Sequence, residues 1–161
     1  DPLFNPDRHT RVQRLYYTAD GTPDFGVPVG NGPLPERFAS ATNAKLLLAH
    51  DGPRLIAANP LLAQTQFRQT PGRAGQQSVM LSPILMPGHY LVARKDGSVA
   101  LEPDSNSADF DLRSQFVRLA DARRGTIRFA AIAAPGKAIG VADGQIRLVR
   151  SRDAAARWRA D

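Results

Sequence analysis

Short apolar runs separated by polar turns recur three times along this chain. Each copy has an apolar run, a turn that ends in Asp-Gly, a second apolar run and a polar loop that closes on an aromatic residue. The Asp-Gly steps, at Asp51, Asp96 and Asp143, lie 45 and 47 residues apart. The closing aromatics, Phe67, Phe116 and Trp158, lie 49 and 42 residues apart. This spacing indicates three copies of one supersecondary unit that can bury their apolar faces only together.

The copies are also similar upstream of these turns. Ser78–Gly88 aligns with Thr126–Gly136 at a constant offset of 48. Pro-Gly then separates the first strand from the second, and Asp-Gly predicts a type I′ hairpin between the second and the third. Four strands in each of three repeats predict an all-β fold, a β-trefoil of twelve strands. Propeller blades are the alternative, but three blades fall short of the roughly four to eight that propellers use.

The pattern also predicts which side chains line the axis of the trefoil. They are Leu47, Leu91, Ile139, Phe67, Phe116 and Trp158.

The first forty residues do not fit the repeat. Residues 11–17 alternate polar and apolar, Asp20-Gly21 marks a turn, and a short second strand ends near Val29, which together predict a β-hairpin. We therefore divide the chain into a hairpin and linker at 1–34 and a trefoil at 35–161, with repeats at about 35–72, 73–121 and 122–161. A two-stranded hairpin is marginal alone. We expect it to pack on the trefoil or on a larger domain outside this chain, and to expose apolar strand edges without that domain.

Composition narrows the possible functions. An apolar content of 42% supports a core, and the lack of cysteine excludes disulfides, thiolate metal sites and a cysteine nucleophile. No apolar run is long enough to span a membrane, so no membrane partner is expected. The net charge of +6 allows a polyanion-binding domain, but the arginines are scattered without long runs. We favour solubility as their role, and nucleic acid is not an expected partner.

Two stretches carry a resemblance to known families. Arg8–Gln13 followed by Thr18–Val29 resembles the closing segment of the five-bladed propeller of family 43 glycoside hydrolases. The repeats resemble the arabinofuranosidase-B-type domain, a β-trefoil carbohydrate-binding module of family 42 that often follows such a propeller. The residues that match this domain are Ser78–Ser82, Pro87-Gly88, Tyr90-Leu91, Val99–Leu101, Phe116, Phe129, Pro135-Gly136 and Trp158.

The resemblance implies a function. It implies a module that recognises arabinofuranose side chains of arabinan or arabinoxylan, polysaccharides of the plant cell wall. It further implies that the module is part of a secreted bacterial α-L-arabinofuranosidase, with a catalytic propeller upstream in cis or as a separate chain. The chain begins at Asp1 without a methionine, which fits the expectation that it is a piece of a larger protein.

In the resembled family, a His after the second strand and an Asp before the closing aromatic form each arabinofuranose pocket. The His position falls at His50, Ala93 and Val141, and the Asp position falls at Gln64, Arg113 and Ala155. The candidate binding residues are therefore His50, Asp51 and Gln64 in the first repeat, and His89, Tyr90, Arg94 and Asp111 in the second. The third repeat has alanines where hydrogen-bonding groups are needed, so no pocket is expected there. The alternative is an eroded trefoil that serves as a structural module.

The sequence shows no convincing catalytic set. A family 43 hydrolase needs three carboxylates on the early blades of its propeller, which lie outside this chain. The glutamates here are Glu36 and Glu102, each beside a proline, and we interpret both as solvated loop residues. His9, His50 and His89 lack the spacing of metal ligands. No catalytic residue, metal or cofactor is therefore expected.

Overall fold

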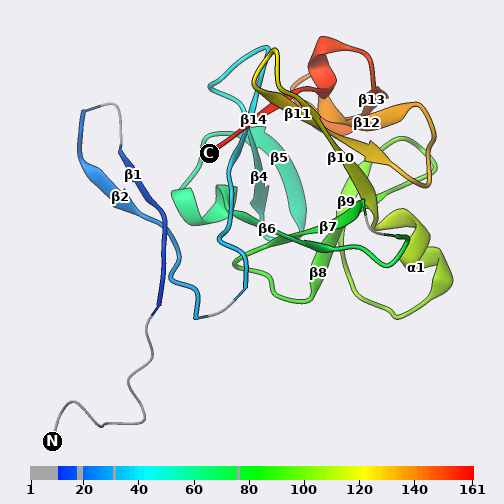
Figure 1. Ribbon diagram of the computed structural model, residues 1–161, viewed down its shortest axis with the longest axis horizontal. Coiled ribbons are helices and arrows are strands. Elements are labelled where there is room, and N and C mark those ends of the chain that lie inside the picture. Colours follow the sequence, from blue (N-terminus) through cyan, green and yellow to red (C-terminus); the bar gives the residue numbers. More distant parts are fainter. Residues whose placement is uncertain (1–10, 18–19, 31, 76) are drawn as a thin grey trace, which may run out of the picture.

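The computed structural model describes residues 11–17, 20–30, 32–75 and 77–161, and these are almost entirely β (Figure 1). A small extension holds β1 (Leu15–Tyr17) and β2 (Pro23–Phe25). The first repeat holds β3 (Phe38–Ser40), β4 (Leu47–Asp51), β5 (Arg54–Ala58), the 3-10 turn η2 (Leu62–Thr65) and β6 (Phe67–Pro71). The second holds β7 (Ser78–Pro83), β8 (His89–Ala93), β9 (Val99–Pro103), the helix α1 (Ala108–Arg113) and β10 (Phe116–Asp121). The third holds β11 (Thr126–Ala131), β12 (Lys137–Ala142), β13 (Gln145–Arg150), the 3-10 turn η3 (Ala154–Ala156) and β14 (Trp158–Ala160).

The first and last strands of each repeat form a closed barrel. They pair antiparallel in the order β3, β14, β11, β10, β7, β6. A bridge between Glu36 and Phe67 joins β6 back to the chain just before β3. Closure leaves no free barrel edge. The other strands form three hairpins, β4–β5, β8–β9 and β12–β13.

The pairing register has the threefold repetition that the sequence predicts. Phe67, Phe116 and Trp158 lie opposite Glu36, Val79 and Ile127, the equivalent residues of their own repeats. In the following repeat, the same aromatics lie opposite Pro83, Ala131 and Ser40, respectively. Each closing aromatic therefore joins its own repeat to the following one. The twelve strands and this register make the fold a β-trefoil, which confirms the predicted class.

The core lies inside the barrel and under the hairpins. All six side chains predicted to line the axis are buried, Leu47, Phe67, Leu91, Phe116, Ile139 and Trp158. Phe38 and Phe129 meet edge to face with their ring centroids 5.1 Å apart. The indole N–H of Trp158 donates to the Ile139 carbonyl oxygen at 2.9 Å, so the largest core side chain keeps no unpaired polar atom.

The three Asp-Gly turns differ, although the sequence predicts one type for all. Only the third has a positive φ at both positions, 52° at Asp143 and 70° at Gly144, as a type I′ turn requires. In the second turn only Gly97 has a positive φ, and the Asp96 carboxylate accepts the Ser98 N–H at 2.9 Å. In the first turn Gly52 has a positive φ and Pro53 follows it. In the second turn the Asp96 cap, and in the first turn Pro53, accompany a conformation other than the type I′ turn that Asp-Gly predicts.

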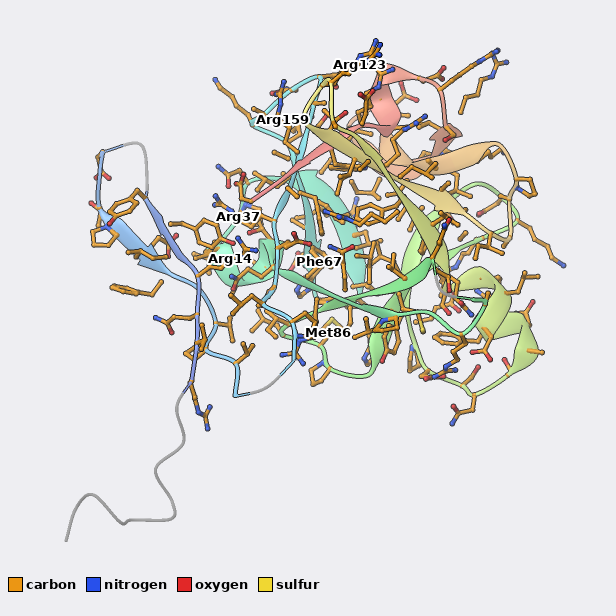
Figure 2. All side chains as sticks on the ribbon, in the orientation of Figure 1. Arg14, Arg37, Phe67, Met86, Arg123 and Arg159 are labelled. Atoms are coloured by element: carbon orange, nitrogen blue, oxygen red, sulfur yellow. The ribbon has the colours of Figure 1, made fainter. Side chains whose placement is uncertain are left out.

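The extension packs one of its faces on the trefoil. Tyr16 and Val29 are buried, and the guanidinium carbon of Arg37 lies 3.8 Å from the centre of the Tyr16 ring. The Val27 N–H donates to the Gln66 side-chain oxygen at 2.9 Å. Figure 2 places Arg14 and Arg37 where the extension meets the trefoil. The division at residues 34 and 35 stays a prediction.

The opposite face of the extension is apolar and exposed, as expected for a hairpin without a neighbouring domain. It presents the side chains of Leu15, Tyr17 and Phe25, which are 47% to 66% exposed.

The described residues include no helix with the length and apolar character needed to cross a membrane.

Candidate carbohydrate-binding sites

Each repeat places a short helical turn beside the first strand of its hairpin. In the first and third repeats these are η2 beside β4 and η3 beside β12, and in the second it is α1 beside β8. The turn comes just before the closing aromatic, so burial of that aromatic in the barrel fixes its position. The residues aligned with the family's His and Asp lie on these neighbouring elements. The three repeats can therefore be compared site by site.

In the first repeat, the side chain of His50 is buried. Its side chain lies edge-on to Phe67 with ring centroids 6.1 Å apart, and its Nδ1 lies 3.1 Å from the Gly52 carbonyl oxygen. Its Nε2 is also shielded from solvent and has no hydrogen-bond partner among the described residues. His50 therefore supports the hairpin turn from inside. The expectation that this ring hydrogen-bonds to a sugar hydroxyl stays a prediction, and the burial of Nε2 weighs against it.

The other two first-repeat candidates remain accessible. Asp51 is exposed at the end of β4. Gln64 is half-buried in η2, where its backbone N–H donates to the Leu61 carbonyl oxygen. Both keep a side chain that can hydrogen-bond to a hydroxyl group.

In the second repeat, the structure separates the four candidates. His89 and Tyr90 begin β8, whereas Arg94 follows its end, about 13 Å further along at roughly 3.3 Å per residue. Tyr90 is half-buried and packs edge-on to Phe110 of α1, with ring centroids 6.2 Å apart. Nδ1 of His89 is buried and has no partner within the described part of the chain.

Two of these four residues are held in ion pairs that the sequence did not predict. Arg73 binds Asp111 and also Asp104, the latter at 2.5 Å. Arg94 binds Glu102 at 2.9 Å. Their charged groups already have intramolecular partners, so a sugar would have to share or displace them.

Glu102 is not a solvated loop residue. It lies in β9, where its second carboxylate oxygen binds Arg113 at 2.9 Å. Partial burial opposes ionisation, but the hydrogen bonds from Arg113 and Arg94 hold the pKa of Glu102 below its usual value. Glu36 is likewise only partly exposed, accepts a hydrogen bond from the Gln69 amide and lies 4.0 Å from Arg118. Both interpretations as solvated loop residues are wrong, because other elements of the fold supply donors that the local sequence does not reveal.

A pocket of about 260 Å³ lies beside the position where the family's second pocket is expected. Its walls come from the end of hairpin β8–β9, from α1 and from the start of the third repeat. Ala93 and Arg113, aligned with the family's His and Asp, both line it. Leu112, Ala133 and Leu148 give it an apolar side, while Asp109 and Arg113 give it polar groups. Sequence reasoning missed α1, although Ser107 accepts the Phe110 N–H as its N-cap and Asp109 lies in its first turn.

In the third repeat, the equivalent space is filled. A Cβ added to Gly140 would lie 2.5 Å from the Ala155 carbonyl oxygen and 2.5 Å from a Val149 methyl group. The missing side chain therefore lets η3 pack directly on β12. Backbone and small apolar groups stand where the family has its pocket.

The described residues contain no group of three or more His, Cys, Asp or Glu that could hold a metal ion.

Comparisons with known proteins agree with this fold. The fold defines a β-trefoil module. It superposes on a crystal structure of an arabinofuranosidase complexed with arabinofuranosyl-alpha-1,2-xylobiose with a TM-score of 0.66 at 12% identity, over 79% of this chain and 30% of that one. It also superposes on the designed threefold-symmetric protein ThreeFoil with a TM-score of 0.59 at 16% identity, over 78% of this chain and 96% of that one. At these identities the likeness concerns the fold.

Sequence similarity gives the relationship. The chain is 41% identical to Alpha-L-arabinofuranosidase B of Pyricularia oryzae over 117 residues, which are 71% of this chain and 24% of that protein. It is 36% identical to Alpha-L-arabinofuranosidase 43 of Humicola insolens over 152 residues, which are 85% of this chain and 31% of that protein. It is 45% identical to an Extracellular exo-alpha-(1->5)-L-arabinofuranosidase of Streptomyces avermitilis over 83 residues, which are 50% of this chain and 17% of that protein. No family model matches the chain.

This chain is thus an arabinofuranosidase-related β-trefoil module, and the resemblance drawn from its sequence is confirmed. It spans about a third or less of the length of these relatives. The alignment with the Humicola protein covers more of the chain than residues 35–161, so it reaches into the extension.

Proposed function

We propose that the chain is a carbohydrate-binding module that recognises arabinofuranose side chains of arabinan or arabinoxylan within a secreted glycoside hydrolase. The main support is the 41% identity to a segment that makes up only 24% of an arabinofuranosidase. A module of this size leaves most of each relative for other parts, including the catalytic machinery. The name of the Streptomyces relative, which includes the word extracellular, supports secretion.

The first and second repeats are the proposed binding repeats. In the first, Asp51 and Gln64 can hydrogen-bond to hydroxyl groups. In the second, the 260 Å³ pocket combines an apolar wall with the Asp109–Arg113 ion pair and with Lys95 and Lys137. Sugar recognition needs this combination, because the ring stacks on apolar surface while its hydroxyls need directed partners. In the enzyme, such binding would raise the effective concentration of polysaccharide near the catalytic site.

Affinity electrophoresis of this chain in gels that contain arabinan or arabinoxylan tests the proposal. We expect retardation in both polymers but not in unsubstituted xylan. Replacing Leu112, which is 51% exposed on the pocket, with Ala should reduce the retardation. The matched control is Leu85→Ala, because Leu85 is 50% exposed and lies outside this pocket. Equal mobility of the unmodified chain in all three gels would exclude the binding function and leave the structural role.

We further propose that the exposed face of the extension contacts the catalytic part of the enzyme. Leu15, Tyr17 and Phe25 gather there on a hairpin too small to bury them. The relatives are longer than this chain, and their additional residues supply a partner for this surface. Adding the remaining enzyme as a separate chain should protect the extension from proteolysis, and Leu15→Ser with Phe25→Ser should abolish that protection.

A further inference from the structure

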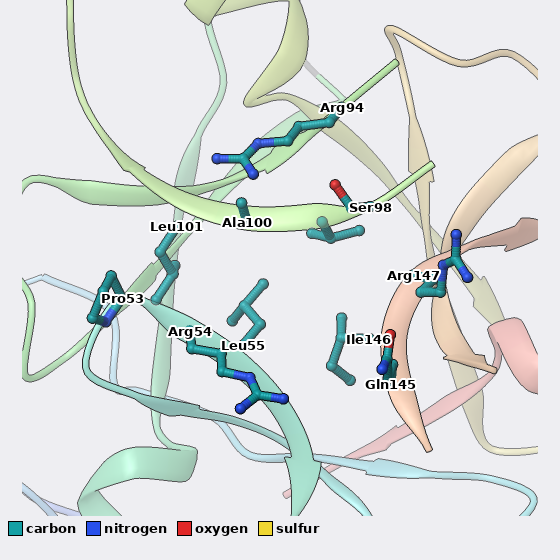
Figure 3. A pocket seen from close by; sticks show the side chains of 11 residues that line it. Pro53, Arg54, Leu55, Arg94, Ser98, Ala100, Leu101, Gln145, Ile146 and Arg147 are labelled. Carbon is teal, nitrogen blue, oxygen red and sulfur yellow. The ribbon is translucent and has the colours of Figure 1, made fainter. Parts of the chain in front are cut away.

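A second pocket of the trefoil lies where its three hairpins meet, and it shares Arg94 with the second-repeat pocket described above. It has a volume of about 510 Å³ and is walled by the third strand of each repeat, β5, β9 and β13 (Figure 3). Leu55, Val99 and Ile146 occupy equivalent positions on these strands, opposite His50, Ala93 and Val141. The pseudo-threefold axis therefore runs through the pocket, and all three repeats contribute an apolar residue to it.

Arginines surround this apolar surface. Arg54 comes from the start of β5, Arg94 from the turn just after β8, and Arg147 from β13. Ser98 and Gln145 are the neutral polar residues that line the pocket with them. None of the described residues that line it is acidic. The pocket therefore offers many hydrogen-bond donors and few side-chain acceptors.

Nearby carboxylates neutralise only part of this positive charge. Glu102 binds Arg94 at 2.9 Å. Asp96 lies close enough to Arg94 and Arg147 for their charges to help lower its pKa, although the hydrogen bonds from Ser98 lower it more. Neither Arg54 nor Arg147 forms an ion pair with any described residue. These two guanidinium groups are available to an external anion.

We propose that this axial pocket binds a saccharide that carries a carboxylate, such as a uronic acid residue. Each hydroxyl of a neutral sugar can both donate and accept a hydrogen bond, and the lining side chains supply few acceptors for the donated ones. A carboxylate accepts two parallel hydrogen bonds from a guanidinium group, and such charge-assisted pairs are strong. The apolar residues from three repeats give the sugar ring a contact surface that a bare inorganic anion would not use.

This site shares Arg94 with the second-repeat pocket but otherwise has its own lining residues, and it uses different chemistry. An enzyme with both would hold a branched polysaccharide by its neutral side chains and by its acidic residues. The two attachments would act together through the effective concentration that one creates for the other.

Titration of the chain with D-galacturonate and with D-galactose tests the charge requirement, because the two sugars differ only in a carboxylate and a hydroxymethyl group. We expect galacturonate to bind at least about tenfold more tightly, a difference that one charge-assisted hydrogen bond supplies. The methyl resonances of Leu55, Val99 and Ile146 should shift during the galacturonate titration. Equal affinity for the two sugars, or unchanged methyl resonances, would overturn the proposal.

Charge-removing variants identify the arginines involved. Arg54→Gln and Arg147→Gln should each weaken galacturonate binding several-fold. Arg123→Gln removes the same charge from the exposed β10–β11 turn, outside the pocket, and should have no effect. A similar loss in Arg123→Gln would mean that net charge alone attracts the anion.

Two further measurements separate the remaining explanations. Inorganic phosphate that displaces galacturonate at an equal concentration would show a general anion site and contradict the saccharide assignment. Retardation in arabinan should be unaffected by Arg54→Gln. If the unmodified chain were not retarded in arabinan, the proposed function would be refuted, and the proposal for the axial site would be unaffected.

Discussion

At the scale of single residues, His50 shows how a binding candidate can serve the fold. The sequence places it on the family's histidine position, and the structure uses its ring to join the first hairpin turn to Phe67. Its Nε2 is shielded from solvent, so a sugar could reach it only after the surrounding side chains moved.

Replacing His50 with Ala should therefore lower the free energy of unfolding by about 2–3 kcal/mol, the range for truncation of a buried side chain. Retardation of the folded variant in arabinan should be unchanged. Urea denaturation measures the first effect and affinity electrophoresis the second. Asp51→Ala is the matched control for stability, since the neighbouring Asp51 is exposed and its removal should cost at most about 0.5 kcal/mol. Lost retardation with unchanged stability would show that the imidazole contacts sugar.

A second residue-scale prediction concerns acid stability. Partial burial opposes the effect, but hydrogen bonds from Arg113 and Arg94 keep the pKa of Glu102 below the ordinary value of 4.5 in the folded chain. The carboxylate thus favours the folded state above pH 4.5, and this contribution is lost as the pH falls through the lower folded pKa.

Glu102→Gln should lower the melting temperature at pH 7 and flatten its decline between pH 4.5 and pH 3, since one group that drives the decline is gone. Thermal melts at a series of pH values, followed by circular dichroism, measure the melting temperature at pH 7 and its decline in acid. Asp51→Asn, at an exposed turn, should leave the profile of the unmodified chain unchanged. An identical acid decline in Glu102→Gln would mean that other carboxylates account for it.

These residues also show where sequence reasoning reached its limit. The burial of Phe67, Phe116 and Trp158 was predictable, because an aromatic residue at a fixed position in each repeat is expected to pack in the core. The partners of Glu102 were not, because Arg113 and Arg94 reach it from a helix and from the neighbouring hairpin strand. A pairing of that kind depends on tertiary geometry and leaves no periodic signal.

At the scale of elements, the repeats share their strands but differ in the turn before each closing aromatic. The second repeat has a capped helix there, whereas the first and third have 3-10 turns. The strands were predictable from hydrophobic alternation. The turns were harder, because side-chain caps at Ser107 and Asp96 compete with the backbone preferences of the dipeptides.

Gly140 marks the clearest element-scale difference. Because a Cβ there would meet the Ala155 backbone at 2.5 Å, Gly140→Ala should push η3 away from β12 and destabilise the chain by roughly 1–3 kcal/mol. Gly30→Ala is the matched control, since a Cβ at Gly30 meets nothing within 4 Å and its φ is not positive. Chemical denaturation of both variants measures the contrast. Equal unfolding free energies would contradict the close packing that fills the third repeat.

At the scale of the whole molecule, a symmetric scaffold supports surfaces that are not symmetric. The barrel register repeats in all three copies, yet His50 is buried, the second repeat keeps a pocket and the third is filled. The sequence could predict the scaffold because burial imposes the same pattern three times. It could not locate the axial pocket, because the lining residues come from three distant segments of the sequence and are brought together only by the fold.

The extension breaks the symmetry most strongly and gives the last prediction. Its inner face is held by Tyr16 under the Arg37 guanidinium and by the hydrogen bond from Val27 to Gln66. Tyr16 is buried, whereas the adjacent Tyr17 is 66% exposed on the outer face. Tyr16→Ala removes a buried ring and a cation–π contact, so it should release the extension while the trefoil stays folded.

Subtilisin should then cleave Tyr16→Ala between residues 11 and 35 faster than the unmodified chain, and the near-ultraviolet dichroism of the buried Trp158 should persist. Tyr17→Ala should be cleaved at the rate of the unmodified chain, since its ring contributes little to the packing. If both variants were cleaved equally fast, the packing of Tyr16 on the trefoil would not be what holds the extension in place. If Tyr16→Ala also lost the Trp158 signal, the extension would be part of the trefoil's own folding unit, and the boundary at residue 35 would be misplaced.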